Sequence, residues 1–328
     1  WGMEPYIQDW LDILANMVNT NTYKLAFGLG ILECVSIKKE KRGMFDTEIT
    51  LLDIGDCMIR YYWNQCFFFH LKQQPGDKVP VIYQQVEALI RRYKELSGSE
   101  IPVWCDKGLG FIEQMDPVFL DKARIKVART IPENVGWRFK NTVNGVKEIY
   151  AFNPKTDTSI YIHNPNADML RDYSSLLSKL FSYKWSELLE KWNESPRLLG
   201  KVFDASKEEI ERHSLTKFIK PLSLQFGDGP IMDFYSKRPI PRSELSLDHV
   251  IPWSYIYSDD IWNLVFTSKS NNSKKSNSTP SQIDINRLKD RNKLLLPKLE
   301  GIYKTEMQES LTSSLVDRYY FGLTRSYL

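Results

Sequence analysis

The sequence lacks the cysteine spacing that marks a metal knuckle or a disulfide framework. Its 328 residues contain four cysteines, Cys34, Cys57, Cys66 and Cys105, all in the first third and none in a CxxC pair. This spacing argues against a zinc site built from cysteines and against a secreted, disulfide-linked fold. We expect buried, reduced thiols.

Long apolar runs and a strong charge of one sign are missing as well. No stretch of eighteen apolar residues occurs, and the first residues lack the features of a signal peptide, so we expect a cytoplasmic protein without a membrane partner. The formal net charge of +3 is too small to indicate nucleic-acid binding by itself. Hydrophobic residues at 42% predict a chain that folds, and its length favours two units or one unit with a large extension.

Apolar residues recur at three-and-four spacing in the N-terminal third, which predicts helices. Gly28 and Gly30 have no strand before them and no third glycine, which favours close helix packing over a phosphate-binding loop. From 136 to 162, aromatic, β-branched and polar residues alternate around Asn144 and Gly145, which predicts a β-hairpin. A winged-helix arrangement and a hairpin that only caps the helices both remain open. The helices are expected over residues 5–18, 22–37, 50–72 and 79–98.

The second half alternates helical and irregular composition. Helical spacing resumes over 167–203, and a charged stretch follows over 206–220. Residues 222–243 are rich in Gly, Pro and Ser, which predicts an irregular connection. Residues 284–323 are again expected to be helical.

One segment between these regions concentrates reactive side chains. Asp248 and His249 end a strand-forming run, and neighbouring strand residues point to opposite faces, so both can serve one site only if the strand ends there. Pro252 favours such an irregular backbone. The composition predicts strand, loop, strand and helix over residues 245–251, 252–263, 264–267 and 271–277.

These residue types suit metal-dependent phosphodiester hydrolysis. Mg²⁺ prefers oxygen ligands and keeps several waters, so the carboxylate of Asp248 and the amide carbonyl of Asn272 are an adequate protein share. With one anionic ligand, the ion keeps net charge for a phosphate oxygen. His249 beside it can act as the general base that takes a proton from the attacking water. Lys275 lies three residues beyond Asn272, on the same helix face, where it is expected to bind the phosphate.

Basic residues at this end form a local excess that the whole-chain charge hides, which predicts contacts to nucleic acid. They are Lys269, Lys274, Lys275, Arg287, Lys289, Arg291 and Lys293.

The sequences DHVIPWS, DDIWN and VFTSKSNNSKKSN resemble the HNH (His-Me finger, ββα-metal) endonucleases, which include prokaryotic restriction and defence nucleases and the HNH domain of CRISPR effectors. In that family an Asp-His pair is followed by one Asn fourteen residues after the His and by an Asn or His twenty-three residues after it. Those offsets fall here on Asn263 and Asn272. The resemblance implies Asp248 and Asn272 as ligands of Mg²⁺ or Mn²⁺, His249 as base, and Asn263 as the residue that braces the loop.

The chain departs from the family's pattern in one respect. Many bacterial members flank the site with two CxxC pairs that bind a structural zinc, whereas residues 233–236 and 268–271 of this chain contain no cysteine. We therefore expect no structural zinc and expect packing or polar contacts to hold the two strands.

The resulting fold prediction is α+β, with an α-rich N-terminal region that carries a small β-hairpin and a C-terminal ββα-metal nuclease domain. The resemblance covers about a quarter of the chain. The expected segments are a helical region, a helical connector, the nuclease domain and a C-terminal helical extension, over residues 1–165, 166–221, 222–300 and 301–328.

Structural roles compete with the functional ones. Asp248 and His249 alone would suit a strand end and a surface histidine, and Asn272 would suit a helix cap. Asp259 and Asp260 are expected to cap a turn, and Trp253 to anchor the core or a loop.

The predicted function is a Mg²⁺-dependent endonuclease of restriction or anti-phage defence that acts on DNA, expected to be double-stranded. Two alternatives stay open: an HNH module that binds nucleic acid without cutting it, and an RNase or toxin that uses the same metal site. A cut in both strands requires two active sites or two events, so a homodimer is a further expectation.

Overall fold

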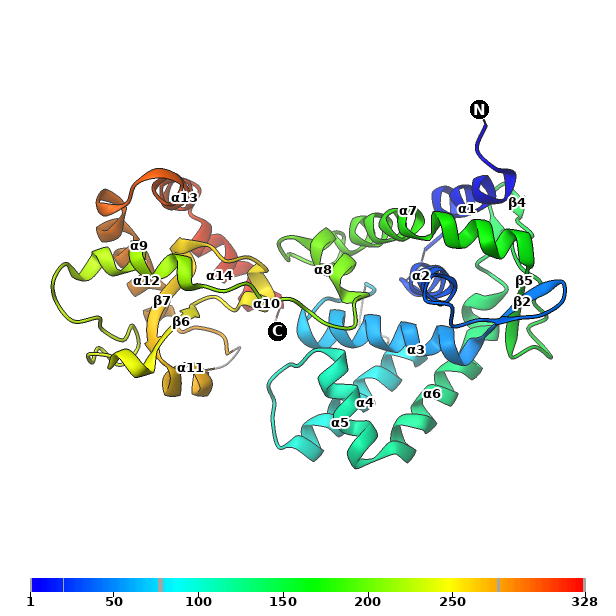
Figure 1. Cartoon of the computed structure of the whole chain (residues 1–328), viewed down its shortest axis with the longest axis horizontal. Coiled ribbons are helices and arrows are strands. Elements are labelled where there is room, and N and C mark those ends of the chain that lie inside the picture. The colour runs from blue at the N-terminus through cyan, green and yellow to red at the C-terminus, as the bar shows by residue number, and fades with distance from the viewer. Residues whose placement is uncertain (1, 20, 76–78, 276–277, 327–328) are drawn as a thin grey trace. The chain divides into compact units, whose positions relative to one another are not determined.

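The computed structural model describes residues 2–19, 21–75, 79–275 and 278–326 and has an α+β fold (Figure 1). The chain forms two compact units. The first comprises Trp1–Asn193 and Leu198–Ile210, and the second comprises Glu194–Arg197 and Glu211–Leu328.

The first unit is mostly helical. The four helices expected from periodicity are present, and α3 continues directly into a π-helical turn at Trp63–Phe68. Two helices were not predicted, α5 and α6. The helices are α1 (Pro5–Asn16), α2 (Tyr23–Ser36), α3 (Leu51–Tyr62), α4 (Val81–Ser97), α5 (Cys105–Met115), α6 (Pro117–Ile131), α7 (Asn164–Leu189) and α8 (Leu198–Ala205).

Short strands complete this unit. The predicted hairpin exists as β3 (Asn141–Thr142) and β4 (Gly145–Val146). A three-stranded antiparallel sheet joins β1 (Lys41–Arg42), β2 (Asp46–Thr50) and β5 (Ser159–His163), with β2 in the middle. Since β5 pairs with β2, the residues after 158 belong to this sheet and not to the β3–β4 hairpin.

Small residues let helix α2 approach its neighbours closely. A Cβ atom on Gly28 would overlap the rings of Phe181, on α7, and Phe139. A Cβ on Gly30 would lie 3.1 Å from Cγ2 of Ile54, on α3. The interpretation of this glycine pair as a packing feature is confirmed, because no side chain fits where the helices touch.

The cysteines of this unit are free thiols. Cys34, Cys57 and Cys105 are buried, as expected, whereas Cys66 is half-buried.

The second unit contains the Asp-His segment. Two strands, β6 (Leu245–His249) and β7 (Leu264–Ser268), pair antiparallel. Helices surround them: α9 (Ile219–Ser223), α10 (Trp253–Ile256), α11 (Lys269–Lys275), α12 (Gln282–Leu295), α13 (Gly301–Thr312) and α14 (Leu315–Ser326). Short 3₁₀ turns at Thr216–Phe218, Leu224–Phe226, Arg242–Glu244, Ile261–Asn263 and Leu296–Lys298 link these elements.

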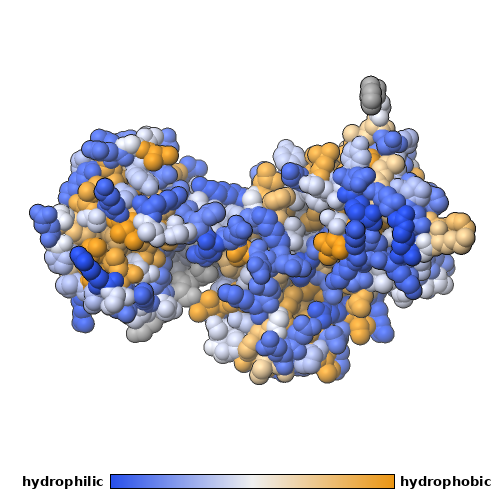
Figure 2. Space-filling view, in the orientation of Figure 1, coloured by the Kyte–Doolittle hydropathy of each residue, from blue (hydrophilic) through white to orange (hydrophobic). Residues whose placement is uncertain are grey.

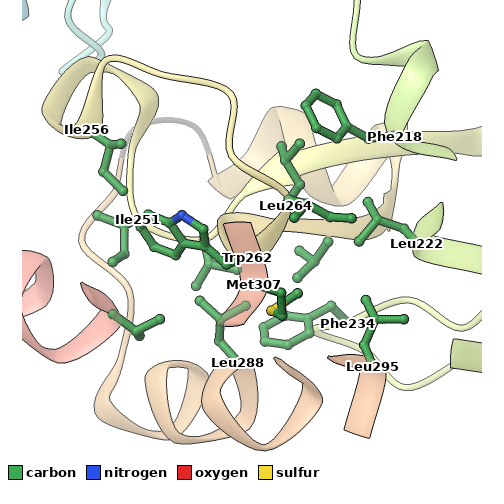
Figure 3. Packing of buried hydrophobic residues seen from close by; sticks show 14 of the residues in the cluster. Phe218, Leu222, Phe234, Ile251, Ile256, Trp262, Leu264, Leu288, Leu295 and Met307 are labelled. Atoms are coloured by element: carbon green, nitrogen blue, oxygen red, sulfur yellow. The ribbon is translucent and has the colours of Figure 1, made fainter. Parts of the chain in front are cut away.

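One apolar core supports the strand pair of this unit. Ile251 and Trp262, from the loop between the strands, pack with Leu264 of β7, Leu288 of α12 and Met307 of α13 (Figure 3). All five are at least 97% buried. The loop after His249 is therefore held by the core at both ends, although its backbone is irregular.

The surface is mixed. Figure 2 shows that hydrophilic residues dominate the visible face of both units, with hydrophobic residues scattered among them. Among the described residues, no helix has the length and apolar character needed to cross a membrane.

The packing of α2 yields a test. Gly28→Ala is expected to lower the free energy of unfolding by about 2 kcal/mol, because the new methyl group displaces two buried rings. Gly110, inside α5, faces open space, so Gly110→Ala is expected to raise that free energy by about 0.5–1 kcal/mol. Urea denaturation followed by circular dichroism measures both, and equal effects of the two substitutions would contradict close packing at Gly28.

Candidate active site

The Asp-His segment has the arrangement expected from its sequence. In the β6–β7 pair, Asp248 lies opposite Val265 and His249 opposite Leu264. Strand β6 ends at His249, and α11 follows β7 without a break. The order is strand, loop, strand and helix.

Three of the predicted site residues meet in one pocket of about 320 Å³, which is lined by Asp248, His249 and Asn272 together with Arg212 and Trp253. Because β6 ends at His249, the two neighbouring side chains of Asp248 and His249 both reach this space. Asn272 comes from α11. The predicted juxtaposition of these three side chains is therefore present.

Asp248 is a nearly buried carboxylate, and one of its two oxygens accepts hydrogen bonds from the protein. Its Oδ2 accepts a hydrogen bond of 2.6 Å from the hydroxyl of Tyr235 and one of 2.7 Å from Nζ of Lys275. Burial and the charge of Asp248 raise the pKa of Tyr235 far above its ordinary value, so Tyr235 stays a donor. The other oxygen, Oδ1, has no hydrogen bond among the described residues.

Lys275 forms an ion pair with the carboxylate of Asp248. Its ammonium group donates to Asp248 Oδ2 at 2.7 Å and to the carbonyl oxygens of His249 and Val250 at 2.8 and 3.2 Å. Three acceptors use the three N–H groups of an ammonium ion. Burial lowers the pKa of Lys275, and the charge of Asp248 opposes that change. Lys275, which was predicted to bind a phosphate, therefore binds three oxygens of the protein itself in this structure.

Asn272 ties α11 to strand β6. Its Nδ2 donates to Oγ of Ser246 at 3.0 Å and to the carbonyl oxygen of Leu247 at 3.2 Å. Both amide hydrogens are therefore directed at β6. The amide oxygen accepts no hydrogen bond from the described residues, so it remains available to a ligand in the pocket.

His249 is held by a carboxylate. Its Nε2 lies 2.9 Å from Oδ1 of Asp259, and both side chains are largely buried, at 6% and 16% exposure. Burial works against ionisation of Asp259, but the hydrogen bond to His249 and the charges of neighbouring basic groups together outweigh it and lower the pKa of Asp259. Because an ionised carboxylate can only accept, Nε2 carries the proton and Nδ1 is the nitrogen with a free lone pair.

Asn263 braces the backbone after the histidine. Its side chain accepts from the amide of Ile251 at 2.9 Å and donates to the carbonyl of the same residue at 2.8 Å. Its own carbonyl accepts from the amide of Val250 at 3.0 Å. Asn263 is fully buried, so these bonds fix the irregular loop against β7.

A second buried carboxylate connects the two segments that correspond to the family's cysteine pairs. Oδ1 of Asp233 accepts from the amides of Tyr235 and Ser236. Its Oδ2 accepts from the amide of Ser268, from Nδ2 of Asn271 and from the hydroxyl of Thr267. Burial alone would raise the pKa of the Asp233 carboxyl, but these hydrogen bonds lower it to about 2. Polar contacts of one carboxylate thus join residues 233–236 to residues 267–271.

The basic surface near the candidate site is smaller than the sequence predicts, because acidic partners neutralise some basic residues and burial removes another. Lys289 pairs with Asp317 at 2.8 Å and Arg287 with Asp284 at 3.4 Å. Arg291 is only 8% exposed, and burial lowers its pKa to about 9. Its expected contribution to a nucleic-acid surface is wrong, because the side chain lies in the core of the unit.

Sequence reasoning missed three contacts at this site. Asp259 was assigned to a turn, and an Asp-Asp pair carries no signal that separates a cap from a partner of His249. Tyr235 lies in an irregular stretch, where no pattern indicates its direction. Arg212 lines the pocket from a charged stretch with no motif.

Comparison with protein families identifies this segment. Residues 233–281 match the family model for HNH endonucleases, which supports nuclease activity for this segment. The resemblance expected from the Asp-His segment is confirmed. Comparison with curated proteins and with solved structures gives no match.

HNH nucleases generally use a divalent cation, and the pocket can be tested for its fit to one. Oδ1 of Asp248 and the amide oxygen of Asn272 accept no hydrogen bond within the described part of the chain, and two such oxygens suit a hard cation that keeps several waters. No group of three or more His, Cys, Asp or Glu side chains with metal-binding geometry occurs among the described residues. The expected set, one carboxylate and one amide, is compatible with that finding.

Asp233 gives the second test. Asp233→Asn is expected to lower the free energy of unfolding at pH 7 by about 2 kcal/mol, because an amide cannot accept all five bonds. The folded-state pKa lies below the unfolded one, so the wild-type contribution is present above about pH 4 and is lost as the pH falls toward 2. Urea denaturation from pH 7 to pH 2 measures this loss. The exposed Asp228 is the matched control as Asp228→Asn, and equal unfolding curves for the two variants would contradict the role of Asp233.

Proposed function

We propose that this protein is a Mg²⁺-dependent endonuclease that hydrolyses phosphodiester bonds of double-stranded DNA. One observation carries the proposal: Asp248, His249 and Asn272, from a strand end and the helix that follows its partner strand, line one pocket within a segment of the HNH endonuclease family.

Asp248 and Asn272 are the proposed ligands of the cation. Each has one oxygen without a partner among the described residues, and both face the same pocket. A bound Mg²⁺ or Mn²⁺ would supply positive charge for a phosphate oxygen and for the leaving oxygen. Two hydrogen bonds from Nδ2 of Asn272 to β6 restrain the amide group, and its oxygen is proposed to bind the cation.

His249 is the proposed general base. Water attacks phosphorus, and Nδ1 of His249 takes its proton, while Asp259 holds the imidazole at Nε2 and stabilises the imidazolium that forms. The bond between phosphorus and the 3′-oxygen breaks, and the leaving oxygen takes a proton from solvent. The products carry a 5′-phosphate and a 3′-hydroxyl, as the family implies. Asn263 positions His249 through the backbone of Val250 and Ile251.

Lys275 is proposed to bind the phosphate. Its ammonium group now neutralises Asp248. A metal cation bound to that carboxylate would replace the charge of Lys275. Lys275 would then leave Asp248 and donate its hydrogen bond to a phosphate oxygen.

The substrate and biological role come from the resemblance. The match to the HNH endonuclease family supports a nucleic-acid substrate. Double-stranded DNA and a role in restriction or phage defence are proposed from the resemblance of the Asp-His segment alone. A homodimer would provide the two active sites that a double-strand cut needs. Plating of phage on cells with the wild-type or the His249→Ala chain tests the defence role.

The base yields the third test. His249→Ala is expected to reduce Mg²⁺-dependent nicking of plasmid DNA by about 10²-fold or more, because no other group in the pocket replaces Nδ1. His163, in the first unit and 61% exposed on its side chain, is the control as His163→Ala and should cut like the wild type. Gel analysis of plasmid and of structured RNA in parallel measures the rates. Equal cutting rates for His249→Ala and the wild type would show that His249 is not the general base. Faster cutting of RNA than of DNA would show that RNA is the substrate.

The metal ligands yield the fourth test, independent of cleavage. Asp248→Asn and Asn272→Ala are each expected to weaken Mn²⁺ binding by about tenfold or more, because each removes or neutralises an oxygen ligand. Electron paramagnetic resonance of free Mn²⁺ measures the affinity, with Asp228→Asn as control. Unchanged Mn²⁺ affinity in both variants would contradict the assignment.

A further inference from the structure

Arg212 lies beside the candidate catalytic residues without an assigned role. It precedes α9 in the charged stretch of the second unit, and its side chain lines the same pocket as Asp248, His249 and Asn272. The side chain is exposed. A molecule that enters the pocket therefore meets Arg212.

The guanidinium group of Arg212 is positioned by an aromatic face. Its Cζ lies 4.1 Å from the ring centroid of Trp253, which is close for a cation over an indole. Trp253 is buried to 92% and contacts the ring of Tyr257, with centroids 4.8 Å apart. Because Trp253 begins α10 just after the end of β6, this stack ties the arginine to the backbone beyond His249.

The donors of Arg212 remain available. Stacking uses the face of the guanidinium plane, whereas its five N–H groups lie in that plane. No hydrogen bond or ion pair joins Arg212 to any described residue, so its contact with Trp253 leaves these donors free. Lys275, in contrast, spends its three donors on three protein oxygens.

The charge of Arg212 suits an anionic ligand. A phosphodiester is an anion that gains charge as its phosphorus is attacked, and a planar guanidinium can donate two parallel hydrogen bonds to phosphate oxygens. The pocket also contains the carboxylate of Asp248, so an anionic substrate needs a cation on the protein side.

We propose that Arg212 is a catalytic residue of this site, which binds the phosphate being cleaved and stabilises the charge that develops on it. This role rests on the proposed nuclease function. Arg212 keeps its protons throughout; it donates hydrogen bonds to the two non-bridging phosphate oxygens, and the bond changes are those given above.

The experiment compares Arg212→Ala, Arg212→Lys and Arg318→Ala, the last a matched exposed arginine on α14. Cleavage of plasmid DNA with Mg²⁺ gives the single-turnover rate. DNA affinity is measured by fluorescence anisotropy in the His249→Ala background, which prevents turnover. Guanidinium chloride at millimolar concentration is added to test chemical rescue.

Arg212→Ala is expected to lower the single-turnover rate by about 10²-fold, with DNA affinity reduced by less than about tenfold. Guanidinium should restore part of the rate in Arg212→Ala and none in His249→Ala. Arg212→Lys should fall in between, because a single point charge does not donate two parallel bonds. Arg318→Ala should match the wild type.

Three results would overturn the proposal. If Arg212→Ala cuts DNA at a rate within about threefold of Arg318→Ala, Arg212 has no catalytic role, and the proposed nuclease function is unaffected. A loss of rate matched by an equal loss of affinity, without rescue, would make Arg212 a binding contact only. A wild-type chain that cuts neither DNA nor RNA would overturn the nuclease function and the role of Arg212 with it.

Discussion

The buried carboxylate of Asp233 joins the loop before β6 to the end of β7 and the start of α11. Its Oδ1 accepts two hydrogen bonds from amides within the loop, and its Oδ2 accepts three from Thr267, Ser268 and Asn271. Family members with cysteine pairs use a zinc ion at the corresponding places. Here a single buried carboxylate makes the connection through backbone amides and short side chains. Because α11 supplies both Asn272 and Lys275, a small shift at Asp233 would move both side chains relative to Asp248.

A buried carboxylate also sets the charge balance of the pocket. Asp248 is 11% exposed and needs a positive partner, and Lys275 provides it. A divalent cation that binds Asp248 competes with this ammonium group for the same charge. If the proposed cation binds Asp248, it would displace this ammonium group, and Lys275 would then be able to bind substrate. Arg212, fixed on Trp253, adds a cation that does not take part in this exchange.

Local sequence patterns predicted which residues meet in the candidate site more completely than they predicted the fold around it. Asp248, His249, Asn263 and Asn272 lie in one short strand, loop, strand and helix unit, so fixed offsets along the chain translate into proximity. The pairing of β2 with β5 joins residues more than a hundred positions apart, and no local pattern encodes it. The contact of Asp259 with His249 could not be predicted, because carboxylates in turns have the same sequence signature as caps. Burial of Arg291 was predictable in principle: it lies on the α12 face of Leu288 and Leu295, which a count of charges ignores.

Asp248, Asn272 and His249 are proposed to surround one cation site. Anomalous diffraction from crystals grown with Mn²⁺ tests it most directly. We expect one manganese peak within coordination distance of a carboxylate oxygen of Asp248 and the amide oxygen of Asn272, with the imidazole of His249 beside it and Nζ of Lys275 moved away from Asp248. Manganese bound elsewhere, with Lys275 still on the carboxylate of Asp248, would contradict it.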